Sequence, residues 1–324
     1  MGSSNTALVI MKFAFVFPGQ GSQSVGMING YTDLPIVQET FQEASDILKQ
    51  DFWSMVNNGP ADDINLTINT QPLMLTAGVA VYRAWTSLEG SKPALLAGHS
   101  LGEYTALVAA EALSFADALS LLRFRAQAMQ QAVPEGVGGM AAILGLDDEL
   151  IEAICHDITN QGQGESLEPA NFNSPGQVVI AGHKSAILRG IEMAKSKGAK
   201  RAIMLPMSIP SHCSLMRPAA ESMQQQLEHV MLHPPKIPIL HNADVKPHPD
   251  TVAIKKILVQ QLISPVRWVD TIRAFAAADI THVVECGPGK VLAGLNKRID
   301  QNLQQLSLEN SETIKQAVNN LRII

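Results

Sequence analysis

The sequence predicts an α/β protein built on a parallel sheet, with a second and smaller unit inserted into it. Apolar segments of strand length alternate with longer helical segments along most of the 324 residues, which is typical of a parallel sheet covered by helices. Two glycine-containing turns, at 19–21 and 98–102, each follow such an apolar segment. Between about 139 and 206 the order of strands and helices changes, which indicates the inserted unit.

The larger unit holds the alternating segments. Its strands are expected at 12–17, 94–97, 237–241 and 281–286. Its helices are expected at 35–50, 71–88, 102–111, 115–132, 218–232, 251–262, 267–278 and 289–299. The polar tail after about residue 300 gives no clear prediction.

The inserted unit reads as strand, helix, two strands, helix, strand. This βαββαβ order is the ferredoxin-like arrangement. We therefore expect a small ferredoxin-like domain at 137–206 and a larger domain formed by 1–136 and 207–324. The six elements are expected at 139–145, 147–160, 169–172, 177–181, 184–197 and 201–205.

Composition and charge exclude several classes of protein. The net charge of −6 gives no general attraction for nucleic acid or for an anionic membrane surface. The three cysteines form no C-x-x-C pair, which fits a reducing cytoplasm without a disulfide framework. The apolar run 7–17 contains Lys12 and lacks a basic leader and a cleavage site, and no apolar stretch approaches 18 residues. We expect a cytoplasmic protein in which Met11 is an alternative start after a ten-residue extension.

The pentapeptide Gly98–Gly102, Gly-His-Ser-Leu-Gly, is the strongest chemical signal. It lies between the apolar run 93–97 and a helical stretch from Glu103, the strand–turn–helix context of a nucleophile elbow. Glycines permit the tight turn, and the exposed Ser100 hydroxyl lies beside backbone N–H groups of the new helix. An ordinary turn is the alternative. We predict that Ser100 is a nucleophile with part of an oxyanion hole next to it.

A serine nucleophile needs a base, and His212 is the best placed of nine histidines. It follows the last strand of the insert and precedes an amphipathic helix. A nearby helix N-terminus disfavours imidazolium, which would keep the ring neutral and able to accept a proton. The alternative is a histidine on a surface loop. His99, inside the elbow, is expected to be structural or substrate-facing.

The turn Phe17–Gln23 follows the first strand and reaches the same edge of the sheet. It is not a dinucleotide fingerprint, because Ser24 stands where glycine or alanine is required, and no P-loop lysine follows. The Gln20 backbone N–H could serve as a second oxyanion donor beside Ser100. A plain connection is the alternative.

Arg125 lies at the edge of the apolar stripe of helix 115–132. At 100° per residue, that stripe is centred on Leu122, and Arg123 lies further round. An inward guanidinium needs an anion, which is either a protein carboxylate or the carboxylate of a substrate.

The segment 184–201 carries a charge of +5 within a protein of −6. A solvated helix face is one interpretation. The other is a docking patch for an acidic partner that includes Lys200 and Arg201, because local charge steers association more than net charge does.

Taken together, these motifs resemble the bacterial malonyl-CoA:acyl carrier protein transacylase family, from about residue 12 to 299. The matching segments, in order, are 17–23, 98–103, Arg125, 171–177, Ser211–His212, Gln261 with 265–268, and 287–290. The resemblance implies a large domain like that of the α/β-hydrolases together with the ferredoxin-like domain. The sequence departs from the family pattern in its ten extra residues at the front and at Ser264, where relatives often have asparagine.

The resemblance also implies a mechanism. Ser100 would take malonyl from malonyl-CoA and pass it to the phosphopantetheine thiol of acyl carrier protein, with His212 as base and then acid. Two residues would supply oxyanion N–H groups, Gln20 and Leu101. Gln261 would hold His212 through a neutral carbonyl where hydrolases use a carboxylate. The substrate-binding residues would be Arg125, His99 and Asn173.

We further expect a monomer without a cofactor or metal, although the sequence itself does not determine the oligomeric state. The sequence also leaves open whether the product feeds fatty acid or polyketide synthesis. A serine esterase or thioesterase shares the elbow, but the acids that could complete its triad all lie in the insert; these are Asp147, Asp148 and Asp157. A non-enzymatic, carrier-binding subunit of a larger synthase is the third possibility.

Overall fold

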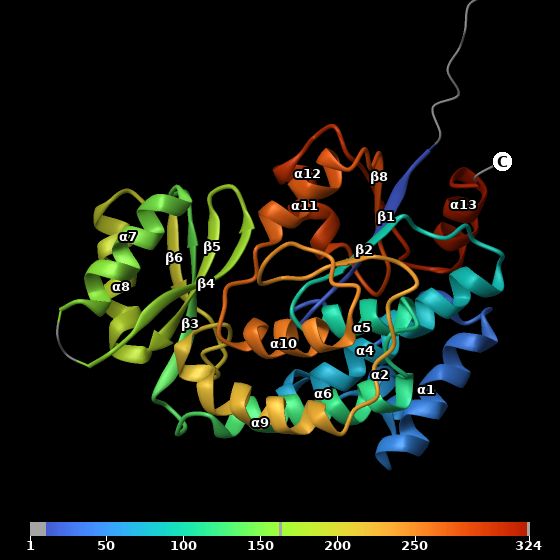
Figure 1. Cartoon of the computed structure of the whole chain (residues 1–324), viewed down its shortest axis with the longest axis horizontal. Coiled ribbons are helices and arrows are strands. Elements are labelled where there is room, and N and C mark those ends of the chain that lie inside the picture. The colour runs from blue at the N-terminus through green and yellow to red at the C-terminus, as the bar shows by residue number, and fades with distance from the viewer. Residues whose placement is uncertain (1–10, 162–163, 323–324) are drawn as a thin grey trace, which may run out of the picture.

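A computed structural model describes residues 11–161 and 164–322, and it contains two separate sheets that lie side by side (Figure 1). The expected extension at 1–10 lies outside the described residues, as do residues 162, 163, 323 and 324. One sheet is parallel and the other is antiparallel. The predicted combination of a parallel α/β unit with a second, differently ordered unit is therefore present.

The parallel sheet runs in the order β7-β2-β1-β8-β9. The central strand β1 is buried along its whole length, which explains its uninterrupted apolar sequence. Its side chains alternate between two cores: Phe13, Phe15 and Phe17 face one, and Ala14 and Val16 face the other. The strands are β1 Phe13–Phe17, β2 Leu95–Gly98, β7 Ile239–Leu240, β8 His282–Glu285 and β9 Gln304–Ser307.

Helices cover both faces of the parallel sheet (Figure 1). The three phenylalanines of β1 pack with one group of helices, which are α1 Pro35–Leu48, α2 Phe52–Asn58, α3 Ala61–Asn65, α4 Thr67–Ser87, α5 Gly102–Ala109, α6 Phe115–Gln131, α9 Arg217–Glu228, α10 Thr251–Leu262 and α13 Ser311–Asn320. The opposite core lies against α11 Trp268–Ala277 and α12 Val291–Ile299. Two short 3₁₀ turns, η1 Asn29–Tyr31 and η2 Ser214–Met216, complete the connections.

The antiparallel sheet runs in the order β4-β5-β3-β6. Apolar residues of α7 and α8, including Ile151 and Ile187, form a core on one of its faces. The opposite face, with Met140 and Val179, packs against Cys213 and so approaches the candidate site. In chain order the elements are β3 Gly138–Leu144, α7 Asp148–Thr159, β4 Leu167–Ser174, β5 Gln177–His183, α8 Lys184–Ser196 and β6 Arg201–Met204, the order that the sequence predicts.

The chain after residue 300 is where the sequence prediction falls short. It forms edge strand β9 and helix α13, which begins with a capping box made by Asn310 and Thr313. β9 is polar because it lies at the edge of the sheet, so its sequence carries little apolar signal. The short helices α2 and α3 are also absent from the prediction. In the described part of the chain, no helix combines the length and apolar character needed to cross a membrane.

The turn between β2 and α5 has the geometry of an elbow. Ser100 has a φ of 52°, in the left-handed region that non-glycine residues rarely adopt. A Cβ on Gly98 would lie 1.9 Å from the Gly102 carbonyl carbon, and one on Gly102 would lie 2.2 Å from the Phe17 carbonyl oxygen. Only glycine at 98 and 102 lets β1, β2 and α5 converge this closely.

Replacement of Gly102 by alanine is expected to destabilise the fold by more than about 2 kcal/mol, because the new methyl group meets rigid backbone. Gly294→Ala is the matched control: Gly294 is an exposed position in α12 with no atom within 4 Å of the added Cβ. That change is expected to be neutral or to stabilise the protein by up to about 1 kcal/mol. Urea denaturation of both variants measures the difference, and equal stabilities would contradict the close approach.

Candidate active site

Seven of the predicted site residues line a cavity of about 160 Å³ at the carboxyl ends of β1 and β2, where the small sheet faces the large one; they are Gln20, His99, Ser100, Leu101, Arg125, Asn173 and His212. Parallel α/β sheets bind ligands at this edge. Gln20, Ser100, Arg125 and His212 line it from the large unit. The small unit contributes apolar and amide side chains, which are Met140, Asn171, Asn173 and Val179.

Ser100 and His212 are in direct contact. The Ser100 Oγ lies 2.8 Å from the His212 Nε2, within hydrogen-bond distance. The His212 Nδ1–H donates to the backbone carbonyl of Gln261 at 2.8 Å, which leaves Nε2 as the acceptor for the serine proton. This arrangement can generate a serine nucleophile.

Burial is the main reason that His212 stays neutral. Its side chain is only 3% exposed, so it is not a surface loop residue. Burial, with the nearby Arg125 charge, lowers the pKa of His212 to about 3, although the hydrogen bond to Gln261 opposes this shift. The chain becomes helical two residues after His212, first as the 3₁₀ turn η2 and then as α9 from Arg217.

Gln261 acts through two different groups. The neutral carbonyl that orients His212 belongs to the Gln261 backbone. The Gln261 side chain points elsewhere: its Oε1 accepts a hydrogen bond from Arg125 at 2.9 Å. None of the acids considered for a hydrolase triad bonds to His212 in the described part of the chain.

Arg125 is a buried cation beside the nucleophile. It is 1% exposed, and its Nη2 lies 3.3 Å from the Ser100 Oγ. Its other hydrogen-bond acceptors are the neutral side-chain oxygens of Gln71 and Gln261, at 2.8 and 2.9 Å. No ion pair joins Arg125 to a carboxylate among the described residues. Burial accordingly lowers the pKa of Arg125, and the site can accept an anionic substrate group.

Two backbone N–H groups remain available at this site. In residues 11–161 and 164–322, no acceptor is bonded to the backbone N–H of Gln20 or of Leu101, and both residues line the cavity. The Pro18–Gln20 turn lies against the elbow, because a Cβ on Gly19 would be 2.5 Å from the His99 carbonyl oxygen. This geometry can place both donors near an oxyanion formed at Ser100.

His99 and Asn173 join the two units across the cavity. The His99 Nε2 lies 2.8 Å from the Asn173 Oδ1, and the His99 ring is 5.4 Å from that of Trp268. Burial lowers the pKa of His99, so it is neutral near pH 7. Both residues line the cavity.

Lys200 and Arg201 lie outside the cavity, at the far end of β6 from it. Arg201 pairs with Leu144, whereas Leu205, one residue beyond β6, lines the cavity. Both basic side chains are exposed. Within the same segment, Arg189 pairs with Glu165 and Lys195 with Glu192, so part of its charge is locally compensated.

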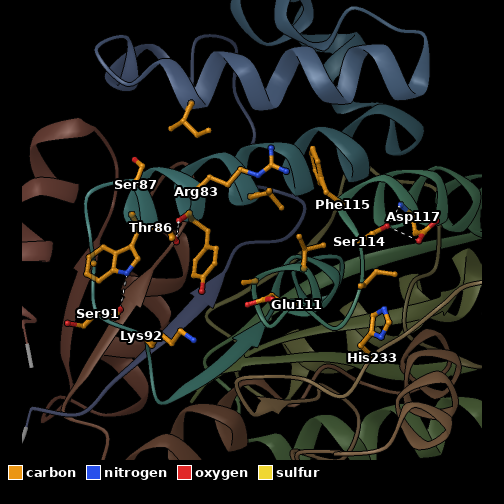
Figure 2. Close-up of a pocket in the computed structure, with 18 of the residues that line it drawn as sticks. Arg83, Thr86, Ser87, Ser91, Lys92, Glu111, Ser114, Phe115, Asp117 and His233 are labelled. Carbon is orange, nitrogen blue, oxygen red and sulfur yellow. Dashed lines mark hydrogen bonds between the residues drawn. The ribbon is translucent and has the colours of Figure 1, made fainter.

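A larger cavity, of about 860 Å³, lies elsewhere, between the end of α4 and the start of α6 (Figure 2). Part of its charged lining is paired: Arg83 with Glu43, and Glu111 with Lys236. Its Ser114 hydroxyl donates to the Asp117 carboxylate at 2.7 Å as the cap of α6, whereas the serine of the smaller cavity contacts a histidine. We therefore place the chemistry in the smaller cavity.

Sequence reasoning missed three buried polar residues around the elbow: Gln71, Glu103 and Asn242. Glu103 carried a usable signal, because an acidic residue inside the otherwise apolar stretch 101–110 needs buried partners. Gln71 and Asn242 carried none. Among the described residues, no group of three or more His, Cys, Asp or Glu side chains is placed to hold a metal ion.

A serine bonded to a histidine on a strand–turn–helix elbow is typical of enzymes that use serine as a nucleophile. Comparison with known proteins identifies the family: the chain belongs to the acyl transferases, whose acyl transferase domain matches residues 14–316. It is 50% identical over 308 residues to the malonyl CoA-acyl carrier protein transacylase of Salmonella typhimurium, covering 95% of this chain and 99% of that protein.

Solved structures agree. The acyl-carrier-protein S-malonyltransferase of Burkholderia pseudomallei has a TM-score of 0.93 and 55% identity, over 95% of this chain and 100% of that one. A malonyl-transacylase solved in complex with a type II PKS acyl-carrier protein has the same TM-score and 45% identity, over 95% and 99% of the two chains.

The lowered pKa of His212 predicts that its ring stays neutral between about pH 8 and 5, because a ring with a pKa near 3 gains a proton only below that range. NMR titration of the imidazole C–H signals, with His212→Gln to assign its resonance, measures this. A midpoint near 6.5 for that resonance would contradict the burial argument.

Proposed function

We propose that this chain transfers the malonyl group of malonyl-CoA to the thiol of an acyl carrier protein, through a malonyl ester of Ser100. The observation that carries this is the buried Arg125 guanidinium, 3.3 Å from Ser100 and without a carboxylate partner in the described residues. A malonyl carboxylate supplies the missing anion. The names of the transacylase relatives support the same substrates.

In the acylation step, His212 Nε2 takes the Ser100 proton while Oγ attacks the thioester carbonyl carbon. The backbone N–H groups of Gln20 and Leu101 stabilise the oxyanion. The C–S bond then breaks, and His212 returns the proton to the departing CoA sulfur. Transfer to the carrier runs in reverse: the carrier thiol gives its proton to His212 and attacks the ester, and Ser100 regains its hydroxyl.

Arg125 also gives a reason for selectivity. An acetyl group leaves the guanidinium buried without its anion, which costs about 1–3 kcal/mol relative to malonyl. His99 and Asn173 line the same cavity and, in this proposal, contact the acyl group or the pantetheine arm.

Hydrolysis is the competing reaction, and a serine esterase is the rival function. Esterases of this fold orient histidine with a carboxylate. Here the Gln261 backbone carbonyl accepts from His212, and the acyl ester would lie against a small cavity with apolar lining, which disfavours attack by water.

The same proposal includes the type of each domain, the oligomeric state, the cellular location and the pathway. The parallel sheet with its elbow corresponds to an α/β-hydrolase-like domain, and the antiparallel sheet to an inserted ferredoxin-like domain at 137–206. The enzyme would act as a cytoplasmic monomer without a cofactor, since the serine, the histidine and the backbone donors account for the whole chemistry. The carrier would serve fatty acid synthesis. Because a relative is complexed with a polyketide carrier, transfer rates to both kinds of carrier decide the pathway.

Intact mass spectrometry tests the proposed reaction. Mixing the protein with malonyl-CoA is expected to add one malonyl group, and Ser100→Ala is expected to abolish the adduct. Rapid release of malonate without an adduct indicates the esterase, and neither product indicates a non-enzymatic carrier-binding subunit.

Arg125→Ala is expected to lower malonyl transfer by about a hundred-fold and to reduce the preference for malonyl-CoA over acetyl-CoA, because a charged hydrogen-bonding partner is lost. Arg123→Ala is the matched control: Arg123 bonds to Gln50 and lies over the Phe52 ring. Steady-state kinetics with both thioesters measure the preference. If it is unchanged in Arg125→Ala, the carboxylate role is wrong.

Carrier docking at Lys200 and Arg201 is also proposed, because both are exposed and basic beside the unit that lines the cavity. Charge reversal, singly and together, is expected to raise the KM for the carrier by about ten-fold without changing that for malonyl-CoA. Lys92→Glu is the control, because Lys92 lies just before β2 of the parallel sheet and lines the larger cavity. Equal effects on both substrates would count against docking.

A further inference from the structure

Glu103 is a buried carboxylate directly beneath the elbow that the proposed reaction does not use. It is fully buried, and it accepts three hydrogen bonds. These come from the His241 Nδ1–H at 2.6 Å, the Asn242 backbone N–H at 3.0 Å and the Gln261 Nε2–H at 3.0 Å. A carboxylate at this depth persists only where its charge is satisfied in this way.

The Glu103 carboxylate fixes which way the Gln261 amide faces. The Gln261 Nε2 is also within 2.9 Å of the Ser100 carbonyl oxygen and 3.2 Å of the Asn242 Oδ1. Three acceptors therefore surround the amide nitrogen. Reversing the amide would turn Gln261 Oε1 toward an ionised carboxylate, so the oxygen is directed to Arg125 instead.

This orientation holds the guanidinium in place. Arg125 donates to the Oε1 atoms of Gln261 and Gln71, which come from two different helices. A reversed Gln261 would present N–H groups to the guanidinium N–H groups and push it from the nucleophile. Glu103 thus acts on the acyl-binding cation through the Gln261 amide, in addition to the direct electrostatic attraction between the two charges.

The nucleophile is held mainly by Asn242, whose backbone N–H also donates to Glu103. The Asn242 Oδ1 accepts from the Ser100 backbone N–H at 2.8 Å, and the Asn242 Nδ2 donates to the Gly98 carbonyl at 2.6 Å. The Asn242 side chain therefore bonds to the backbone of the elbow at both Gly98 and Ser100. Glu103 therefore connects to Ser100 through Asn242 and to the Arg125 guanidinium through Gln261, and only the second connection is expected to change the ratio between malonyl and uncharged acyl groups.

We propose that Glu103 is a positioning residue that sets the selectivity for malonyl over uncharged acyl groups, by orienting the Gln261 amide and through it Arg125. This proposal rests on the proposed function. A neutral amide at position 103 cannot accept three N–H groups. One of the three N–H groups would then face the new amide NH2 group. Moving the His241 proton from Nδ1 to Nε2 does not remove this clash without cost, because the buried Nε2 has no partner in the described residues and would carry an unsatisfied N–H.

The test measures the rates of Ser100 acylation by malonyl-CoA and acetyl-CoA, and takes their ratio. Glu103→Gln is expected to lower this ratio by about ten-fold. Glu111→Gln is the matched control, because Glu111 lies just beyond the same helix and is exposed. The same substitution at 103 is then made in a Gln261→Leu background, which removes the amide but keeps the backbone carbonyl that holds His212.

If Glu103 acts through Gln261, the substitution at 103 lowers the ratio in the native background and leaves it unchanged in the Gln261→Leu background. Equal losses with both thioesters at constant ratio indicate a merely structural residue and overturn the proposal. A similar fall of the ratio in both backgrounds overturns the route through Gln261. If Glu103→Gln does not fold, Gln261→Leu alone decides, since an unchanged ratio there also overturns it.

The wild-type arm separates this proposal from the proposed function. Absence of a malonyl adduct on the wild-type protein refutes the transacylase itself. A wild-type adduct with an unchanged ratio in Glu103→Gln refutes only the role of Glu103.

Discussion

The arrangement of the site depends on one buried positive charge, the Arg125 guanidinium beside the Ser100 hydroxyl. Its protein acceptors are neutral amide oxygens, so its capacity for an anion is kept for a ligand. A carboxylate holding His212 so close by would compete for that cation. The Gln261 backbone carbonyl orients the histidine without adding a charge, so the described residues leave Arg125 without a carboxylate partner.

The negative charge that the site does contain lies one layer deeper. Glu103 is separated from Arg125 by the Gln261 side chain and is satisfied by three N–H groups. It can therefore orient the layer above without pairing with the guanidinium directly. Neutral His212, cationic Arg125 and the buried carboxylate follow one another around the elbow, and the same burial that lowers the pKa of His212 strengthens each hydrogen bond among them.

The two sheets contribute different residues to the cavity. The parallel sheet supplies the elbow, the Gln20 turn and the α6 arginine, whereas the antiparallel sheet contributes Met140, Asn173 and Val179 as the opposite wall. The backbone bridge between Asn171 and Val266 joins the units close to Gln261. The cavity is small because both sheets close on it, and its lining limits the water that can compete for an acyl ester.

The sequence alone determined the alternation of strands and helices and the elbow with Ser100, because these depend on local periodicity and on short motifs. It left His212 and Arg125 open between alternatives, and only the family resemblance gave them roles. Tertiary structure decided the rest. The sequence could not tell the Gln261 backbone from its side chain, nor attribute the neutrality of His212 to burial, since both depend on contacts between segments 49 or more residues apart. Gln71, Asn242, the edge strand β9 and the capped helix α13 escaped prediction for the same reason: a polar residue becomes structural only when the fold brings its partner to it.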